Sequence, residues 1–171
     1  MTRDQHAAFL AHLDRHKALL YKVANAYCPR RENRGDLIQD IVLELWRAWP
    51  RYDGRAAVST WMYRIAVNVA ISAFRGEGRR IRDALPIEEF GLDLAAADRM
   101  LDAEGDDLRA LYQLIARLDE VNRALILLYL EGYGQDEIAD MLGISASNVA
   151  TRVNRIKQRL QRDYAASEES P

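Results

Sequence analysis

GYGQDEIADMLGISASNVATRVNRIKQRLQRDY, residues 132–164, indicates the fold more directly than any other part of the chain. Its first part, 135–142, has the composition of a short helix and is followed by Gly143, which can adopt the left-handed conformation that ends a helix. Ser145 is a residue type that caps the next helix, which we expect over 146–164. A short helix, a glycine turn and a capped longer helix predict a helix-turn-helix, whose second helix enters the major groove of DNA.

Apolar residues in this stretch fall where two crossed helices would touch. They are Ile138, Ala139, Leu142, Ile144, Val149, Val153 and Ile156. The second helix also concentrates positive charge, opposed only by Asp163. The basic residues are Arg152, Arg155, Lys157, Arg159 and Arg162. The formal net charge of −2 and the pI of about 5.9 argue mildly against nucleic-acid binding when the chain is taken whole, but they hide this segregation.

Side chains early in a recognition helix usually reach the base edges, and basic residues beside phosphates release counterions and contribute salt-sensitive affinity. The residues predicted to bind DNA in this segment are Ser145, Ser147, Asn148, Thr151, Arg152, Arg155, Lys157 and Arg159. The structural alternative is a pair of amphipathic helices with a solvated basic face.

Helical patterns also dominate the rest of the chain. Of 171 residues, 49% are hydrophobic and only four are proline, so a packed helical core is expected. Periodic apolar residues predict helices over 4–28, 36–49, 60–75, 108–118 and 120–131. Ser59 is placed to cap the third of these, and Pro29 with the charged residues after it breaks the pattern between the first two.

The segment from 81 to 107 has a different composition. It contains Pro86, Gly91 and Gly105 and is rich in Asp and Glu, with few large apolar residues at a sustained helical period. This composition predicts an acidic linker with, at most, short helical turns. We therefore expect an all-α fold, two small helical bundles over 1–80 and 108–171 joined by a flexible acidic linker.

Two long stretches carry a resemblance to a known family. DLIQDIVLELWRAWPRYDGRAAVSTWMYRIAVNVAISAFR, residues 36–75, resembles region 2 of sigma-70 family factors of the small extracytoplasmic-function (ECF) group. ARLDEVNRALILLYLEGYGQDEIADMLGISASNVATRVNRIKQRL, residues 116–160, resembles region 4 of the same group. The resemblance implies a sigma factor that directs core RNA polymerase to promoters, with region 2 at the −10 element and region 4 at the −35 element.

For the first stretch, the resemblance implies that one edge of a helix grips a coiled coil of the polymerase. The matching residues are Asp36, Gln39, Asp40 and Trp46. Spacings of three and four place the polar ones on one helical face, where acids suit a basic partner and Trp46 can serve as an apolar anchor. The acid-rich run that often precedes this helix in the family is reduced here to Asp36. A solvated helix face is the alternative.

The resemblance places the next helix at the −10 element. The matching residues are Trp61, Tyr63, Arg64, Asn68, Ser72 and Arg75, followed by Arg79 and Arg80 as phosphate contacts. Planar groups can hold unstacked bases, and cations can hold the displaced strand. Spacing alone does not assign both Trp61 and Tyr63 to DNA, and because large aromatics dominate small cores we expect Trp61 to be the core residue.

Other classes of function remain as alternatives. The sequence lacks a phosphate-binding loop of the GxxxxGKS type and a GxSxG elbow, so we expect no enzyme and no cofactor. His12 and His16 could face one metal ion, but no acid is clearly placed to complete the site, and a helix face is the simpler interpretation. A helix-turn-helix regulator that acts without joining polymerase, or a helical interaction module without DNA contacts, would also fit part of the pattern.

Cys28 is the only cysteine, so an intramolecular disulfide is excluded, which fits a reducing cytosol. The longest apolar runs are too short to span a bilayer. We expect a cytoplasmic chain that is a monomer when free, with core RNA polymerase and promoter DNA as partners and an anti-sigma factor, which is typical of the family, as a further one.

Overall fold

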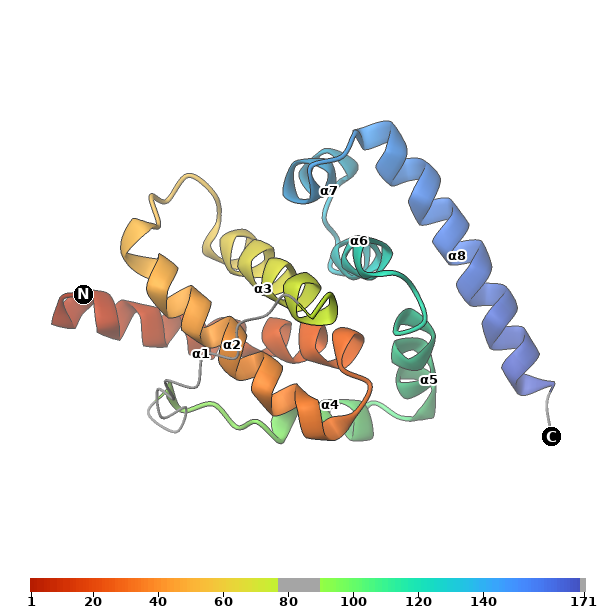
Figure 1. Ribbon diagram of the computed structural model, residues 1–171, viewed down its shortest axis with the longest axis horizontal. Coiled ribbons are helices and arrows are strands. Elements are labelled where there is room, and N and C mark those ends of the chain that lie inside the picture. Colours follow the sequence, from red (N-terminus) through yellow and green to blue (C-terminus); the bar gives the residue numbers. More distant parts are fainter. Residues whose placement is uncertain (77–89, 170–171) are drawn as a thin grey trace. The chain divides into compact units, whose positions relative to one another are not determined.

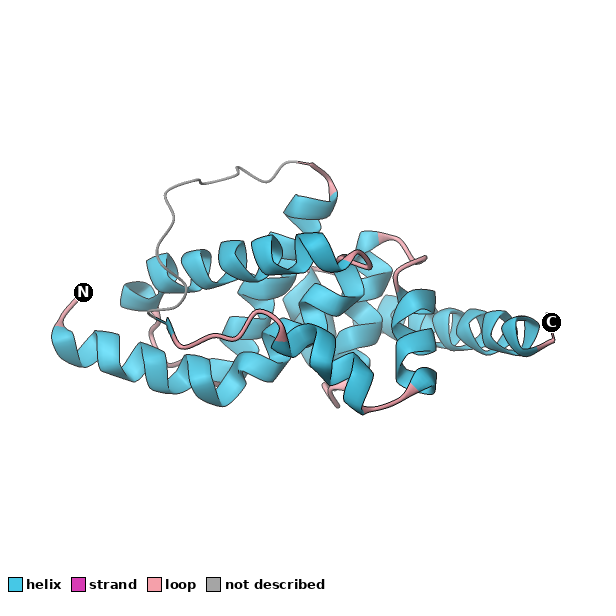
Figure 2. Ribbon diagram, turned by 90° about the horizontal axis from the view of Figure 1, so that it is seen from below, coloured by secondary structure: helices cyan, strands magenta, loops and turns pink. Residues whose placement is uncertain are grey.

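The computed structural model describes residues 1–76 and 90–169, and every regular element in these ranges is a helix (Figure 2). The chain divides into two compact units, residues 1–100 and 101–171. The prediction of an all-α fold with two helical domains is therefore confirmed.

The first unit is built on three long helices, α1 (Arg3–Tyr27), α2 (Arg31–Ala48) and α3 (Val58–Phe74), each in contact with the other two (Figure 1). A short 3₁₀ turn, η1 (Trp49–Arg51), follows α2 and contains Pro50, which cannot continue an α-helix. Each helix turns one apolar face inward, so the core is shared by all three. Its most deeply buried large side chains are Phe9, Leu13, Leu20, Ile38, Ile41, Leu45, Met62 and Tyr63.

Two helix starts differ from the sequence prediction. α2 begins at Arg31, not near Asp36, because Arg34 is buried and its guanidinium donates to the carbonyl oxygens of Cys28 (2.7 Å) and Pro29 (3.1 Å). These bonds satisfy the end of α1 and let the charged turn become the first turn of α2. The cap prediction for Ser59 is wrong, since α3 already begins at Val58 and no side chain caps it.

Part of the segment expected to be a linker belongs to the first unit. Residues 90–95 lead into α4 (Ala96–Ala103), and Ala97 is fully buried. The buried amide of Asn25 donates to the Ala97 carbonyl oxygen at 3.0 Å, and Arg34 pairs with Asp98. The expected linker boundaries, 81 and 107, therefore do not match the division of the chain, because a few apolar and hydrogen-bonding residues dock on α1 and α2 despite the acidic composition around them.

The second unit contains α5 (Asp106–Ile115), α6 (Glu120–Leu130), α7 (Gln135–Leu142) and α8 (Ala146–Glu168). α8 packs against the other three, and it continues beyond Tyr164, whose hydroxyl donates to Asp107 at 2.9 Å. The buried guanidinium of Arg123 donates to the Leu118 carbonyl oxygen at 2.7 Å and so closes the turn between α5 and α6.

Neither unit offers a helix that could cross a bilayer, as far as the described residues go. The rings of His12 and His16 stack in parallel with centroids 6.3 Å apart, and His12 also contacts Trp49. Within the described ranges, no third His, Cys, Asp or Glu joins this pair in a group that could hold a metal ion.

Candidate nucleic-acid interface

The helix-turn-helix in the second unit has the geometry that its sequence predicts. Gly143 adopts the left-handed conformation at φ 69° and ends α7, and the Ser145 side chain accepts from the Asn148 backbone N–H at 3.2 Å to cap α8. Val149 and Ile156 are buried, which fixes the rotation of α8 about its own axis. The prediction of this motif is confirmed, and the opposite side of α8 is left to solvent.

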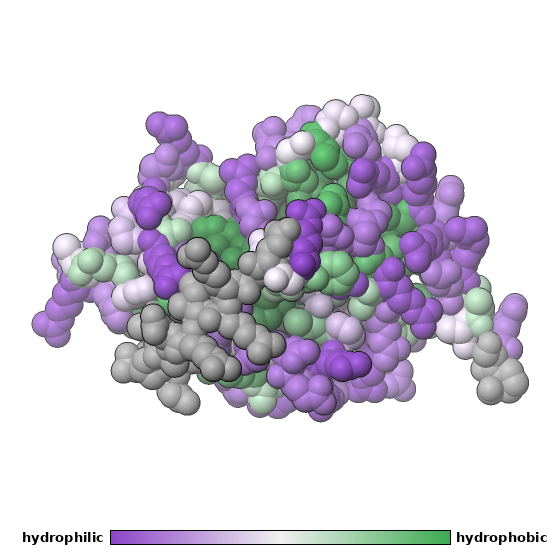
Figure 3. Space-filling model, in the orientation of Figure 1, coloured by the Kyte–Doolittle hydropathy of each residue, from purple (hydrophilic) through white to green (hydrophobic). Residues whose placement is uncertain are grey.

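The solvent side of α8 is polar along its first three turns. Its exposed residues at helical spacing are Ser147, Thr151, Asn154, Arg155 and Gln158. The part of α8 seen in Figure 3 is accordingly mostly hydrophilic. Asn154 and Gln158 are absent from the residues predicted to bind DNA, although the spacing from Ser147 and Thr151 already indicates them. Amide and hydroxyl groups with an arginine are the residue types that read base edges.

Three other predicted residues are held by neighbours. Arg152 is half-buried, and its Nε and Nη1 donate to Asn148 (3.0 Å) and to Asn122 of α6 (3.4 Å). Lys157 lies about 120° round the helix from Thr151, with its ammonium 5.5 Å from the centre of the Tyr129 ring. Arg159 pairs with Asp163 at 3.7 Å. These cations therefore flank the Thr151 face, as phosphate contacts would.

In the first unit, α3 brings together most of the residues predicted for its DNA face. Trp61, Arg64, Asn68 and Arg75 follow one another at spacings of three, four and seven, so they share one side of the helix, with Ser72 at its edge. Arg64, Asn68 and Arg75 are exposed. Arg79 and Arg80 lie outside the described residues.

Tyr63 is the exception, and the expectation for the two aromatics is reversed. The Tyr63 side chain has 0% exposure and belongs to the core, whereas Trp61 is only half-buried. The reason is rotational, because Tyr63 falls on the same side of α3 as Ala66 and Ala70, which are also fully buried. Tyr63 is therefore removed from the DNA-facing set, and Trp61 stays in it.

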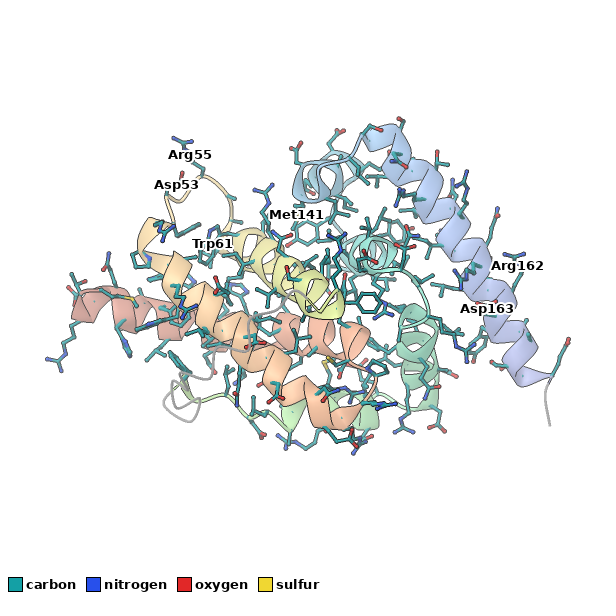
Figure 4. The ribbon with its side chains drawn as sticks, in the orientation of Figure 1. Asp53, Arg55, Trp61, Met141, Arg162 and Asp163 are labelled. Atoms are coloured by element: carbon teal, nitrogen blue, oxygen red, sulfur yellow. The ribbon has the colours of Figure 1, made fainter. Side chains whose placement is uncertain are left out.

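The loop before α3 adds residues that the sequence prediction treated only as a turn. The rings of Trp49 and Tyr52 stack at 5.5 Å, and Trp61 contacts both, at 5.9 and 5.1 Å. We call these three rings the aromatic cluster. Asp53 and Arg55 form the exposed tip of the loop above it (Figure 4). Their side chains pair at 3.1 Å, and the Arg55 side chain is 90% exposed. An arginine beside stacked aromatic rings can hold a nucleobase and a phosphate together.

The polar edge of α2 is a second candidate surface. Asp36, Asp40 and Glu44 recur every four residues and form an acidic stripe, with Gln39 exposed beside it. Burial, and then the carboxylates of Asp36 and Glu44, raise the pKa of Asp40. A basic partner would offset this repulsion, so the stripe is suited to a cationic surface.

Trp46 is not a free-standing anchor. Its ring is half-buried and lies edge-on to Phe9 (5.2 Å), His6 (4.9 Å) and Phe90 (5.5 Å). The residues predicted on α2 thus divide into an open acidic stripe and an aromatic position that the chain itself partly covers.

Comparison with protein families gives two matches in chain order. Residues 12–80 match Sigma-70 region 2, and residues 108–160 match Sigma-70, region 4. The first match covers α2 and α3, and the second covers the helix-turn-helix.

Several curated proteins are similar over most of the chain. The ECF RNA polymerase sigma factor SigM of Mycobacterium tuberculosis is 29% identical over 149 residues, which cover 86% of this chain and 72% of that protein. The RNA polymerase sigma factor NccH of Alcaligenes xylosoxydans is 29% identical over 162 residues, or 92% and 86% of the two chains. The ECF RNA polymerase sigma-E factor of Escherichia coli K12 is 28% identical over 134 residues, or 72% and 69%.

Two solved structures share the fold. One is CnrH in complex with the cytosolic domain of CnrY, with a TM-score of 0.62 and 24% identity over 94% of this chain and 90% of that one. The other is the sigma factor RpoE in complex with the anti-sigma factor NepR from Bartonella quintana, with a TM-score of 0.65 and 20% identity over 94% and 96%.

Proposed function

The chain belongs to the ECF group of the sigma-70 family, and from this premise we propose that it binds core RNA polymerase and directs it to promoters. The single observation that carries the proposal is the presence, in one chain and in family order, of an acidic docking stripe on α2 and a solvent-facing recognition surface on α8. A regulator that never joined polymerase would have no use for the first of these.

The docking part of the proposal rests on electrostatics. Burial raises the pKa of Asp40, and repulsion from the carboxylates of Asp36 and Glu44 raises it further. Contact with basic residues of the polymerase would offset the repulsion between the carboxylates, and Trp46, about 120° round the same helix from Asp40, would add buried area. Binding through this helix leaves the α3 and α8 surfaces available for DNA.

The promoter part of the proposal uses both DNA-facing surfaces. α8 meets the −35 element through the Thr151 face, with Arg152, Lys157 and Arg159 on the flanking phosphates. The exposed side of α3 and the aromatic cluster below Arg55 meet the −10 element, where aromatic and cationic groups can hold separated strands. The protein contributes binding energy and strand capture, and the bond chemistry belongs to the polymerase.

We also propose an anti-sigma factor as a partner. The support is that both solved relatives are complexes, one with the cytosolic domain of CnrY and one with the anti-sigma factor NepR. A protein that covered either the acidic stripe or the α8 face would prevent transcription from starting.

The test is in vitro transcription with core polymerase, this chain and fragmented genomic DNA, followed by mapping of the new start sites. We expect start sites that appear only when the chain is added and that share a sequence near −35. Asp40→Asn should bind polymerase more weakly, whereas Arg155→Ala should keep polymerase binding and weaken promoter use. Arg117→Ala, which removes the same charge at an exposed turn of the second unit, is the matched control. A purified chain that binds DNA but never co-migrates with core polymerase would contradict the proposal.

A further inference from the structure

Residues 90–95 and the first turn of α4, residues 96–98, lie along one edge of α2, and we call residues 90–98 the strap. Near the C-terminal end of α2, the Phe90 ring contacts Trp46 at 5.5 Å and Phe9 at 6.1 Å. Near the N-terminal end, Leu94 lies 3.5 Å from the position that a side chain on Gly35 would take, and Asp98 pairs with Arg34. The strap therefore runs antiparallel to α2 (Figure 1).

The edge under the strap is the one that carries part of the proposed polymerase surface. Gly35 and Trp46, which the strap contacts, lie on one line along α2, and Gln39 on the same line stays exposed. The acidic stripe of Asp36 and Asp40 lies about 100° round the helix from this line. In the free chain, the strap thus occupies the aromatic half of the docking surface and leaves the acidic half open.

The contacts that hold the strap are specific but few. Arg34 is 7% exposed, and Asp98 supplies the negative charge beside it. Asn25 binds the Ala97 carbonyl oxygen at 3.0 Å, and Leu92 is buried with 8% exposure. α4, into which the strap leads, has 8 residues, and a helix of that length is marginal in water without tertiary contacts. A small set of contacts that orders a short, locally unstable segment can be released by a competing partner.

We propose that the strap is an intramolecular competitor of core polymerase: it covers the Gly35–Trp46 edge of α2 in the free chain and leaves this edge when the polymerase binds. The inference rests on the proposed function of α2 as the docking helix. The aromatic contact decides it, because the Trp46 ring cannot meet Phe90 and a polymerase surface at the same place. The apparent affinity for polymerase is then the intrinsic affinity multiplied by the fraction of chains in which the strap is open.

The test compares Asp98→Asn with Asp106→Asn. Both changes remove one carboxylate, but Asp98 pairs with the buried Arg34 and Asp106 pairs with Arg109 on the exposed surface of α5. Hydrogen exchange of the free chain should be faster over 90–103 in Asp98→Asn than in the parent. Binding to fluorescent core polymerase should be tighter by about fivefold, because a change that raises the fraction of open chains about fivefold raises the apparent affinity equally. Asp106→Asn should change neither quantity by more than about twofold.

Phe90→Ala provides a second variant that opens the other end of the strap without uncovering a buried charge, and thermal unfolding checks that each variant is folded. Faster exchange with unchanged or weaker polymerase binding would overturn the inference, and so would unchanged exchange in both Asp98→Asn and Phe90→Ala. If the parent chain itself does not bind polymerase, the proposed function has failed. If the parent binds polymerase but the variants bind no better than the parent, only the inference about the strap has failed.

Discussion

Replacing Tyr63 separates a core role from a DNA-binding role, since the sequence assigned this residue to DNA and the structure places it in the core. Tyr63→Ala removes a side chain with 0% exposure from the centre of the first unit. We expect a large loss of stability in that unit. Tyr63→Phe keeps the ring and should leave both the fold and promoter binding nearly intact.

The size of the effect follows from burial. An aromatic side chain buries about 150–200 Å² on folding, which at ~25 cal/mol per Å² corresponds to about 4–5 kcal/mol. Truncation of buried aromatics to alanine costs roughly 3–5 kcal/mol. Because a loss of 1 kcal/mol lowers the melting temperature of a 60–100-residue domain by about 4–8 °C, Tyr63→Ala should melt at least ~12 °C below the parent. Tyr63→Phe keeps the whole buried ring and should therefore melt close to the parent.

Tryptophan fluorescence is the appropriate assay. The chain has three tryptophans, Trp46, Trp49 and Trp61, and all lie in the first unit. Fluorescence during heating or urea titration therefore reports the first unit alone, even if the second unit melts separately. Binding of the polymerase complex to a promoter fragment is measured in parallel at a temperature where each variant is folded.

Arg64→Ala is the matched comparison, since Arg64 is the exposed neighbour of Tyr63 on α3. It should keep the parent's melting temperature and weaken promoter binding. Our reasoning would be refuted if Tyr63→Phe melted like the parent but bound the promoter tenfold more weakly. In that case the tyrosine hydroxyl would contact DNA in the promoter complex, and the Tyr63 side chain would have to leave the core when the complex forms.

Three further predictions concern the two proposed surfaces. Arg155→Ala should weaken promoter binding and make the slope of log affinity against log salt shallower by about 0.9, the contribution of one phosphate contact, as measured by fluorescence anisotropy between low and moderate salt. Ser145→Ala should cost the second unit about 1 kcal/mol by removing the cap of α8, seen as faster amide exchange in the first turn of that helix, while Ser145→Asn should restore protection. Asp40→Asn should bind polymerase more weakly yet be more stable than the parent at neutral pH. The pKa of Asp40 is raised on folding, so the parent loses stability as pH rises through the titration of this carboxyl. The variant has no carboxyl at this position and does not lose this stability. An advantage of Asp40→Asn that is as large at pH 3 as at pH 7 would contradict this.

The sequence predicted most of the second unit correctly because its signals are local. The left-handed glycine at 143, the cap at Ser145 and the apolar spacing of α7 and α8 each act within a few residues, so the chain segment carries the full instruction. The prediction did not identify which face of α8 is exposed to solvent. Asn154 and Gln158 are on the solvent side of α8 because Val149 and Ile156 are buried on the other.

The first unit shows where local signals are insufficient. α2 starts a turn early because Arg34 binds carbonyl groups at the end of α1 and a carboxylate from α4 that is 64 residues away in the sequence. No local pattern announces such a partner. The same holds for residues 90–98, whose acidic composition suggests a linker, although Leu92 and Ala97 are buried and Phe90 contacts Phe9 of α1 and Trp46 of α2.

Composition, caps and motif order are properties of the chain, so they were sufficient to predict the all-α class, the helix-turn-helix with its basic second helix, and the resemblance to the ECF group. Which side of each helix is available to a partner depends instead on how the helices pack. Tyr63 and Trp61 are two residues apart, and both are aromatic. Their roles are separated by the rotation of α3 against α1 and α2, which is set by the packing of all three apolar faces at once.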